Sequence, residues 1–120
     1  MPDDKLPNRL HVVKPWGSFD QFTLNESSTV KILTVDSGQR LSLQSHQQRY
    51  EYWLAVDDGL IAEIDGVDHW LAIGEEITIA QGTRHRLRYE GNGQGRVLEI
   101  SFGTFDEGDI TRYADDYHRA

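Results

Sequence analysis

Short segments rich in β-branched and aromatic residues recur along this chain, separated by glycine and aspartate turns. Their spacing of roughly 8–12 residues is typical of an all-β sandwich or barrel, and helical periodicity is nearly absent. The Asp65-Gly66 pair predicts a two-residue hairpin, because both central positions of a type I′ turn need a positive φ. The expected strands are residues 17–24, 29–35, 40–44, 50–56, 60–64, 67–73, 77–79, 86–89 and 97–102.

Many short strands in 120 residues predict one domain that buries a core without crosslinks. We expect a jelly roll, in which two sheets fold over each other and leave few strand edges exposed. A meander barrel is the alternative architecture. We expect the domain to span residues 1–120, with a loose arm over about 1–9 and a tail over about 106–120 that has room for one helical turn. The expected core includes Ile32, Leu43, Leu54, Ile64 and Ile79.

The composition excludes several functional classes. A formal net charge of −8 opposes polyanions, so neither nucleic acid nor an acidic membrane surface is an expected partner. The absence of cysteine excludes disulfides and thiolate metal sites, and it leaves imidazole, carboxylate and amide groups as ligands. No apolar run approaches the ~18 residues that cross a bilayer, so a cytoplasmic protein is expected.

Two segments carry the candidate ligands. His46, Gln48 and Glu51 lie on one segment and His85 on another, each bounded by glycine turns. Imidazoles and a carboxylate that project from short strands into one cavity suit a divalent ion with open coordination positions. The amide of Gln48 ligates through oxygen, which favours Mn²⁺ or Fe²⁺ over Zn²⁺, and a simple hydrogen-bonding role is its alternative.

Residues 38–59 and 74–85 resemble the two cupin motifs. More narrowly, residues 14–19, 41–44, 49–53, 82–87 and 109–117 are similar to the type II phosphomannose isomerase domain. That domain often forms the C-terminal part of bifunctional enzymes with mannose-1-phosphate guanylyltransferase activity, and it also occurs alone, as we expect here. The resemblance runs from about Lys14 to Arg119 and implies a cupin-type double-stranded β-helix, a jelly-roll barrel. The family usually carries a run of histidines where this chain has His46-Gln47-Gln48.

The resemblance implies metal-dependent interconversion of mannose 6-phosphate and fructose 6-phosphate by a homodimer whose ligand is a small sugar phosphate. Two alternatives stay open, a non-catalytic module that binds a sugar or sugar phosphate and a different metallo-cupin enzyme such as a dioxygenase. The implied roles are divalent metal binding by His46, Gln48, Glu51 and His85, substrate binding by Arg49, Arg86 and Lys14, and proton transfer by Glu63 or Glu99.

Overall fold

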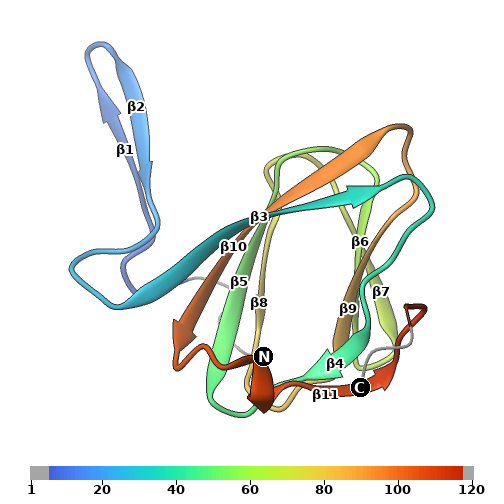
Figure 1. Ribbon diagram of the computed structural model, residues 1–120. Coiled ribbons are helices and arrows are strands. Elements are labelled where there is room, and N and C mark those ends of the chain that lie inside the picture. Colours follow the sequence, from blue (N-terminus) through green and yellow to red (C-terminus); the bar gives the residue numbers. More distant parts are fainter. Residues whose placement is uncertain (1–5, 118–120) are drawn as a thin grey trace.

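The computed structural model describes residues 6–117, which form two facing β-sheets and a separate hairpin (Figure 1). A 3₁₀ turn, Glu107–Asp109, is the helical element of this part of the chain. No helix within these residues has the length and apolarity that a membrane span requires. The strands are β1 (Leu10–Lys14), β2 (Gly17–Gln21), β3 (Ser28–Asp36), β4 (Leu43–Ser45), β5 (Arg49–Ala55), β6 (Leu60–Ile64), β7 (Val67–Leu71), β8 (Glu76–Ile79), β9 (His85–Tyr89), β10 (Gln94–Gly103) and β11 (Thr111–Ala114).

The strand order is that of a jelly roll. One sheet has the order β3-β10-β5-β8 and the other β11-β4-β9-β6-β7, and all neighbouring strands are antiparallel. From β3 to β6 the chain crosses to the opposite sheet with each new strand (Figure 1). The all-β, cupin-type prediction is confirmed, and the two-layer arrangement brings residues far apart in sequence to one interior.

The main core lies between the two sheets. Side chains alternate along a strand, so β5 sends Trp53 and Ala55 inward while Tyr52 points to the outer face. A second, smaller cluster covers part of that outer face. The inner cluster comprises Val35, Trp53, Ala55, Leu60, Ala62, Leu71, Ile79, Leu87, Tyr89 and Val97, and the outer one Leu6, Tyr52, Ile100 and Phe102.

Most expected strands are present within a few residues of their predicted bounds. Asp65 and Gly66 have φ of 49° and 80°, which confirms the hairpin turn. Strands β1 and β11 were not expected, because both consist largely of exposed residues without the usual alternation. The predicted loose arm lies partly outside the described residues, and its described end is ordered, with Leu6 buried. The tail contains the expected helical turn, and its last three residues lie outside the described part.

One predicted core residue is wrong. Ile32 is 55% exposed on the outer face of β3, whereas Ile79 is buried. In β3 the residues Lys31, Leu33 and Val35 are less exposed than their neighbours, which shows that the odd-numbered positions face the interior. Leu43, Leu54 and Ile64 are partly buried.

Candidate metal centre and its cavity

Three buried side chains from both sheets meet at one point in the interior. His46 follows β4 and His85 begins β9 in one sheet, while Glu51 lies on β5 in the other. Their nearest ligand atoms all lie within 4.8 Å of one another, and no side chain of the three is more than 2% exposed. The structure therefore brings together the two imidazoles and the carboxylate of the predicted set.

Backbone carbonyls determine which ring nitrogen of each imidazole carries the hydrogen. The Nδ1 atom of His46 lies 3.1 Å from the Arg49 carbonyl, and that of His85 lies 2.9 Å from the Thr83 carbonyl. A carbonyl only accepts, so each Nδ1 carries the hydrogen and each Nε2 of a neutral ring presents a lone pair. These Nε2 atoms lie 3.3 Å and 3.5 Å from the Glu51 carboxylate oxygens.

Three ligand atoms of this set have no hydrogen-bond partner among the described residues. His46 Nε2, His85 Nε2 and Glu51 Oε1 are buried, and their close approaches lack hydrogen-bond geometry. Burial raises the pKa of Glu51. The adjacent imidazoles of His46 and His85 lower this pKa by more than burial raises it, so the net pKa is well below its usual range. Lone pairs that converge on an ionised carboxylate need a cation among them, so these residues fit a divalent ion that accepts nitrogen and oxygen.

The amide nearest this interior is Gln44, and the structure does not bring Gln48 to the set. Gln48 is exposed in the turn between β4 and β5, where its backbone N–H donates to Asp109 at 2.9 Å. Gln44 lies on β4 opposite His85 and lines the cavity beside Glu51. Strand alternation alone offered both amides, because Gln44 and Gln48 each stand two positions from His46, and the end of β4 at Ser45 places only Gln44 on the strand.

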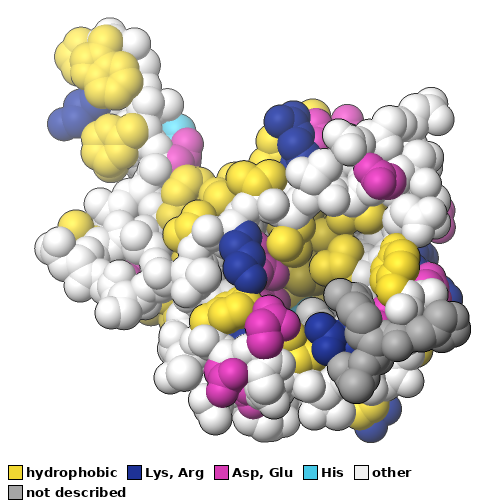
Figure 2. Space-filling model, viewed as in Figure 1, with side chains coloured by type: hydrophobic (Ala, Val, Ile, Leu, Met, Phe, Trp, Pro, Cys, Tyr) yellow, Lys and Arg dark blue, Asp and Glu magenta, His cyan; other side chains and the backbone are white. Residues whose placement is uncertain are grey.

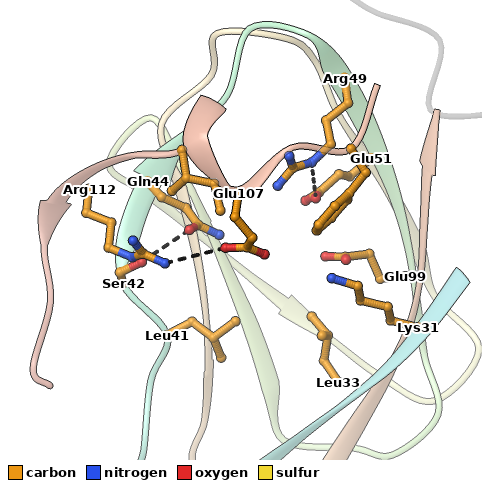
Figure 3. A pocket seen from close by; sticks show the side chains of 12 residues that line it. Lys31, Leu33, Leu41, Ser42, Gln44, Arg49, Glu51, Glu99, Glu107 and Arg112 are labelled. Atoms are coloured by element: carbon orange, nitrogen blue, oxygen red, sulfur yellow. Dashed lines mark hydrogen bonds and ion pairs between the residues drawn. The ribbon is translucent and has the colours of Figure 1, made fainter. Parts of the chain in front are cut away.

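A cavity of about 160 Å³ opens beside Glu51 (Figure 3). Its wall carries the cations Lys31, Arg49 and Arg112, and the carboxylates Glu51, Glu99 and Glu107 face it as well (Figure 3). The other lining residues are Leu33, Leu41, Ser42, Gln44, Phe105 and Ile110. A partly open space of this size suits a small ligand, since pockets for drug-sized ligands have volumes of roughly 300–1,000 Å³.

The three cations stand at different places in the cavity wall. Arg49 is 2% exposed, and its Nε lies 3.4 Å from Glu51 Oε2. Its guanidinium stacks 4.1 Å from the centre of the Phe105 ring, and the Lys31 ammonium lies 3.7 Å from the same centre. Arg112 Nη2 lies 3.9 Å from Glu107 Oε2. Arg49 is thus part of the scaffold beside Glu51, whereas Lys31 and Arg112 line the cavity farther from the ligand set.

Two of the three predicted substrate contacts lie elsewhere. Arg86 is buried, and it donates to the carbonyls of Leu41 at 3.1 Å and Ala114 at 3.3 Å, which ties β9 to the segment before β4 and to β11. Lys14 is exposed on the hairpin and does not line the cavity. Sequence reasoning missed Lys31, although a lysine in phase with Leu33 and Val35 was a signal. Arg112 gave no signal, because β11 was not expected.

The two candidate proton acceptors occupy different places. Glu99 is 6% exposed on the cavity wall, where the Trp53 indole donates to it at 3.1 Å. Burial and then the nearby charge of Glu51 raise the pKa of Glu99 to about 7. Glu63 lies on β6, 3.5 Å from the Arg88 guanidinium, and is absent from the cavity lining.

Sequence comparison shows which protein family this chain resembles. Residues 2–115 match the family model described as mannose-6-phosphate isomerase C-terminal. The chain is 34% identical to mannose-1-phosphate guanylyltransferase of Escherichia coli K12, over 98% of this chain and 25% of that protein. It is also 34% identical to the alginate biosynthesis protein AlgA of Pseudomonas putida, over 93% of this chain and 23% of that protein. The chain thus spans about a quarter of the length of these relatives.

Solved structures with the same fold are more distant in sequence. The capsular polysaccharide assembling protein CapF of Staphylococcus aureus superposes with a TM-score of 0.66 at 17% identity, over 87% of this chain and 34% of that one. A cupin-superfamily sugar phosphate isomerase of Silicibacter pomeroyi gives a TM-score of 0.60 at 16% identity, over 72% and 68% of the two chains. These likenesses support the cupin fold.

Proposed function

Because the chain belongs to the mannose-6-phosphate isomerase C-terminal family, we propose that it interconverts mannose 6-phosphate and fructose 6-phosphate with the help of a divalent metal ion. The observation that carries this proposal is the buried set of His46, Glu51 and His85, in which both Nε2 atoms and Glu51 Oε1 converge without hydrogen-bond partners among the described residues. The cavity beside that set holds both cations for a phosphate and a carboxylate for proton transfer.

His46, Glu51 and His85 would hold the ion, with the Gln44 amide oxygen as the nearest candidate for a fourth protein ligand. Three or four protein ligands leave open positions for a substrate. When bound, the ion supplies a Lewis acid that stabilises negative charge on the sugar oxygens at C1 and C2. Carbonyl contacts at Nδ1 keep the rings oriented for this task.

Lys31 and Arg112 are the proposed contacts for the phosphate. Both line the cavity, Lys31 beside Glu99 and Arg112 beside Glu107 (Figure 3). An acidic protein binds an anionic ligand only through such a local group of cations. Arg49 is the positioning residue in this scheme, because its guanidinium lies against Glu51 and Phe105 and so fixes the carboxylate.

Glu99 is the proposed proton acceptor. Of the three cavity carboxylates, Glu51 belongs to the ligand set and Glu107 lies near Arg112, which leaves Glu99 facing the cavity beside Lys31 (Figure 3). Isomerisation of the aldose moves a proton from C2 to C1 while the O2 hydroxyl proton passes to O1, so no atom or electron is gained or lost. A carboxylate within reach of both carbons performs the carbon-to-carbon transfer.

The test combines metal analysis with an isomerase assay. Protein purified without chelator is expected to contain about one divalent ion per chain and to convert mannose 6-phosphate. The double variant His46→Ala/His85→Ala should lose both the metal and the activity, while His69→Ala, an exposed histidine on β7, keeps both.

The outcomes separate the proposal from its alternatives. Metal and sugar phosphate binding without conversion would reject the isomerase and favour a sugar-phosphate binding module. Unmodified protein that takes up no Mn²⁺, Fe²⁺ or Zn²⁺ would reject the metal site itself. Oxygen consumption with an unphosphorylated substrate would point to a different metallo-cupin activity.

A further inference from the structure

We propose that Phe105 is a second positioning residue of this site, because its ring holds the Lys31 ammonium out in the cavity and away from the carboxylate of Glu99. The ammonium is thereby kept available for an anionic ligand. That the anion is the phosphate of a sugar rests on the proposed function. Phe105 lies in the segment that joins β10 to the 3₁₀ turn, and its side chain lines the cavity.

Charges of both signs surround the cavity. Figure 2 shows the hollowed face between the two sheets, where basic and acidic side chains lie next to one another around an apolar interior. A cation that is paired with a carboxylate is largely neutralised, and an incoming phosphate must compete with that carboxylate. The affinity for an anion therefore depends on which cations are held apart from the carboxylates.

Lys31 is the cation best placed for pairing within the sheet. It lies directly opposite Glu99 in the register of β3 and β10, and both residues line the cavity. Opposite positions on neighbouring strands place Cβ atoms about 4.5–5.5 Å apart, which lets a lysine and a glutamate form an ion pair. The ammonium instead lies 3.7 Å from the centre of the Phe105 ring, within reach of its negative π face. In Figure 3, dashed lines mark the ion pairs of the two arginines, and none joins Lys31 to Glu99.

The ring is held in place by the backbone on both sides of it. The Thr104 N–H donates to the Gln48 carbonyl at 3.1 Å, and the Arg49 guanidinium donates to the Asp106 carbonyl at 3.5 Å. These contacts tie Phe105 to the start of β5. The ring is therefore a fixed partner for the flexible lysine side chain, and it sets where the ammonium stands.

The same ring also brings two like charges together. The Lys31 ammonium lies against it, and the Arg49 guanidinium stacks 4.1 Å from its centre. The attraction of each cation to the π face offsets part of the repulsion between them. The remaining repulsion is relieved when an anion binds, so this arrangement favours an anionic ligand over a neutral one.

The first test measures the binding of mannose 6-phosphate and of mannose by calorimetry. Phe105→Leu keeps an apolar side chain but has no π face, so it should weaken mannose 6-phosphate binding by roughly 2-fold to 30-fold, the range of a cation–π contact. Mannose binding should change little, and Phe105→Tyr should bind both sugars like the unmodified protein. The matched control is Phe22→Leu, which removes a ring 4.4 Å from the Arg9 guanidinium at the base of the hairpin and should leave both affinities unchanged.

A double-mutant cycle separates positioning from a structural role. Lys31→Met alone should weaken mannose 6-phosphate binding by roughly 10-fold or more. Phe105→Leu should cause no further loss in the Lys31→Met background, because the ring acts through the ammonium. A side chain that only supported the fold would cause the same loss in both backgrounds.

The place of the ammonium can also be observed without any ligand. The chain has three lysines, Lys5, Lys14 and Lys31, so their ε-methylene signals are few enough to assign by NMR. Protons over the face of an aromatic ring resonate upfield, and the Lys31 ε-methylene protons should therefore be shifted upfield. This shift should disappear in Phe105→Leu and persist in Phe22→Leu.

Four results would overturn the proposal: an unshifted Lys31 signal, unchanged mannose 6-phosphate binding in Phe105→Leu, equal losses in the two backgrounds, or unmodified protein that binds mannose 6-phosphate no better than mannose. Protein that gives the expected binding and NMR results but does not isomerise the sugar would support the role of Phe105 and reject the proposed reaction.

Discussion

At the scale of single residues, the site is defined by which atoms are left to bind a ligand. The Nδ1 atoms of His46 and His85 are engaged by carbonyls, so both Nε2 atoms turn to Glu51. The proposed fourth ligand is Gln44, because it pairs with His85 and lines the cavity, rather than a residue of the run His46-Gln47-Gln48. Three predictions concern individual side chains around this set.

The first prediction concerns the side-chain amide of Gln44. Gln44→His should tighten binding of Zn²⁺ or Co²⁺ relative to Mn²⁺, because imidazole suits the later ions better than an amide oxygen. Gln48→His is the matched control and should leave all affinities unchanged, since Gln48 is exposed in the turn. Competition titration with a chromophoric chelator measures both. A larger effect at Gln48 than at Gln44 would refute the assignment.

The second concerns the proposed proton acceptor. Glu99→Gln keeps the shape and the acceptor for the Trp53 indole but removes the carboxylate, so kcat should fall by about 10²-fold to 10⁴-fold with little change in KM. Metal content must stay at the unmodified level, since Glu99 lies close to Glu51. Glu63→Gln serves as the control. Full activity in Glu99→Gln would remove this residue from the mechanism.

The third prediction concerns the contact between Arg112 and the phosphate group of the sugar. Arg112→Ala should weaken mannose 6-phosphate binding by roughly 10-fold to 150-fold, because a charge-assisted contact contributes about 1.5–3 kcal/mol. Binding of unphosphorylated mannose should change little. Arg96→Ala, which removes an exposed arginine paired with Asp57, is the control, and calorimetry measures all three proteins. Equal losses for both sugars would mean that Arg112 does not contact the phosphate.

At the scale of elements, the site depends on how β10 ends beside β5. Gly103 pairs with Arg49 at the last position of β10 and has a φ of 108°. A Cβ at this position would overlap the Gln48 carbonyl oxygen, and the next residue donates its N–H to that same oxygen at 3.1 Å. The end of the strand therefore requires both the backbone conformation and the space that glycine provides.

Replacement of this glycine should destabilise the fold more than a positive φ alone explains. Gly38 has a φ of 75° with open space around its Cβ position, so Gly38→Ala isolates the conformational cost of about 1–3 kcal/mol. Gly103→Ala should lower the free energy of unfolding by more than that, as measured in urea. Equal losses would show that the strand end shifts without cost.

At the scale of the whole molecule, the ligand set joins the two sheets. Glu51 comes from one sheet and both histidines from the other, so a bound ion links the layers across the core. Metal at 100 times its Kd should stabilise the folded state by about 2.7 kcal/mol, which calorimetry detects as a higher Tm. A chelator should lower that Tm, and the His46→Ala/His85→Ala variant should respond to neither addition. A Tm that is insensitive to metal in the unmodified protein would contradict this link.

The sequence was enough to predict most of the strands and three of the four proposed ligands that meet in the interior. Period-two runs and the Asp65-Gly66 turn depend on residues that are neighbours in the chain, so they predict the jelly-roll elements without tertiary information. Glu51 could be identified because a carboxylate beside an apolar run needs a partner, and His46 and His85 because of their place in the two motifs.

Only the tertiary structure decided which faces of those strands meet. Alternation puts Lys31 in phase with Leu33 and Val35, but both faces of β3 carry apolar residues, so it could not show which face meets the cavity. The choices of Gln44 over Gln48 and of Arg112 over Arg86 likewise depend on the pairing of β4 with β9 and β11. Such pairings join residues far apart in the chain, and local periodicity carries no information about which distant strand becomes the neighbour.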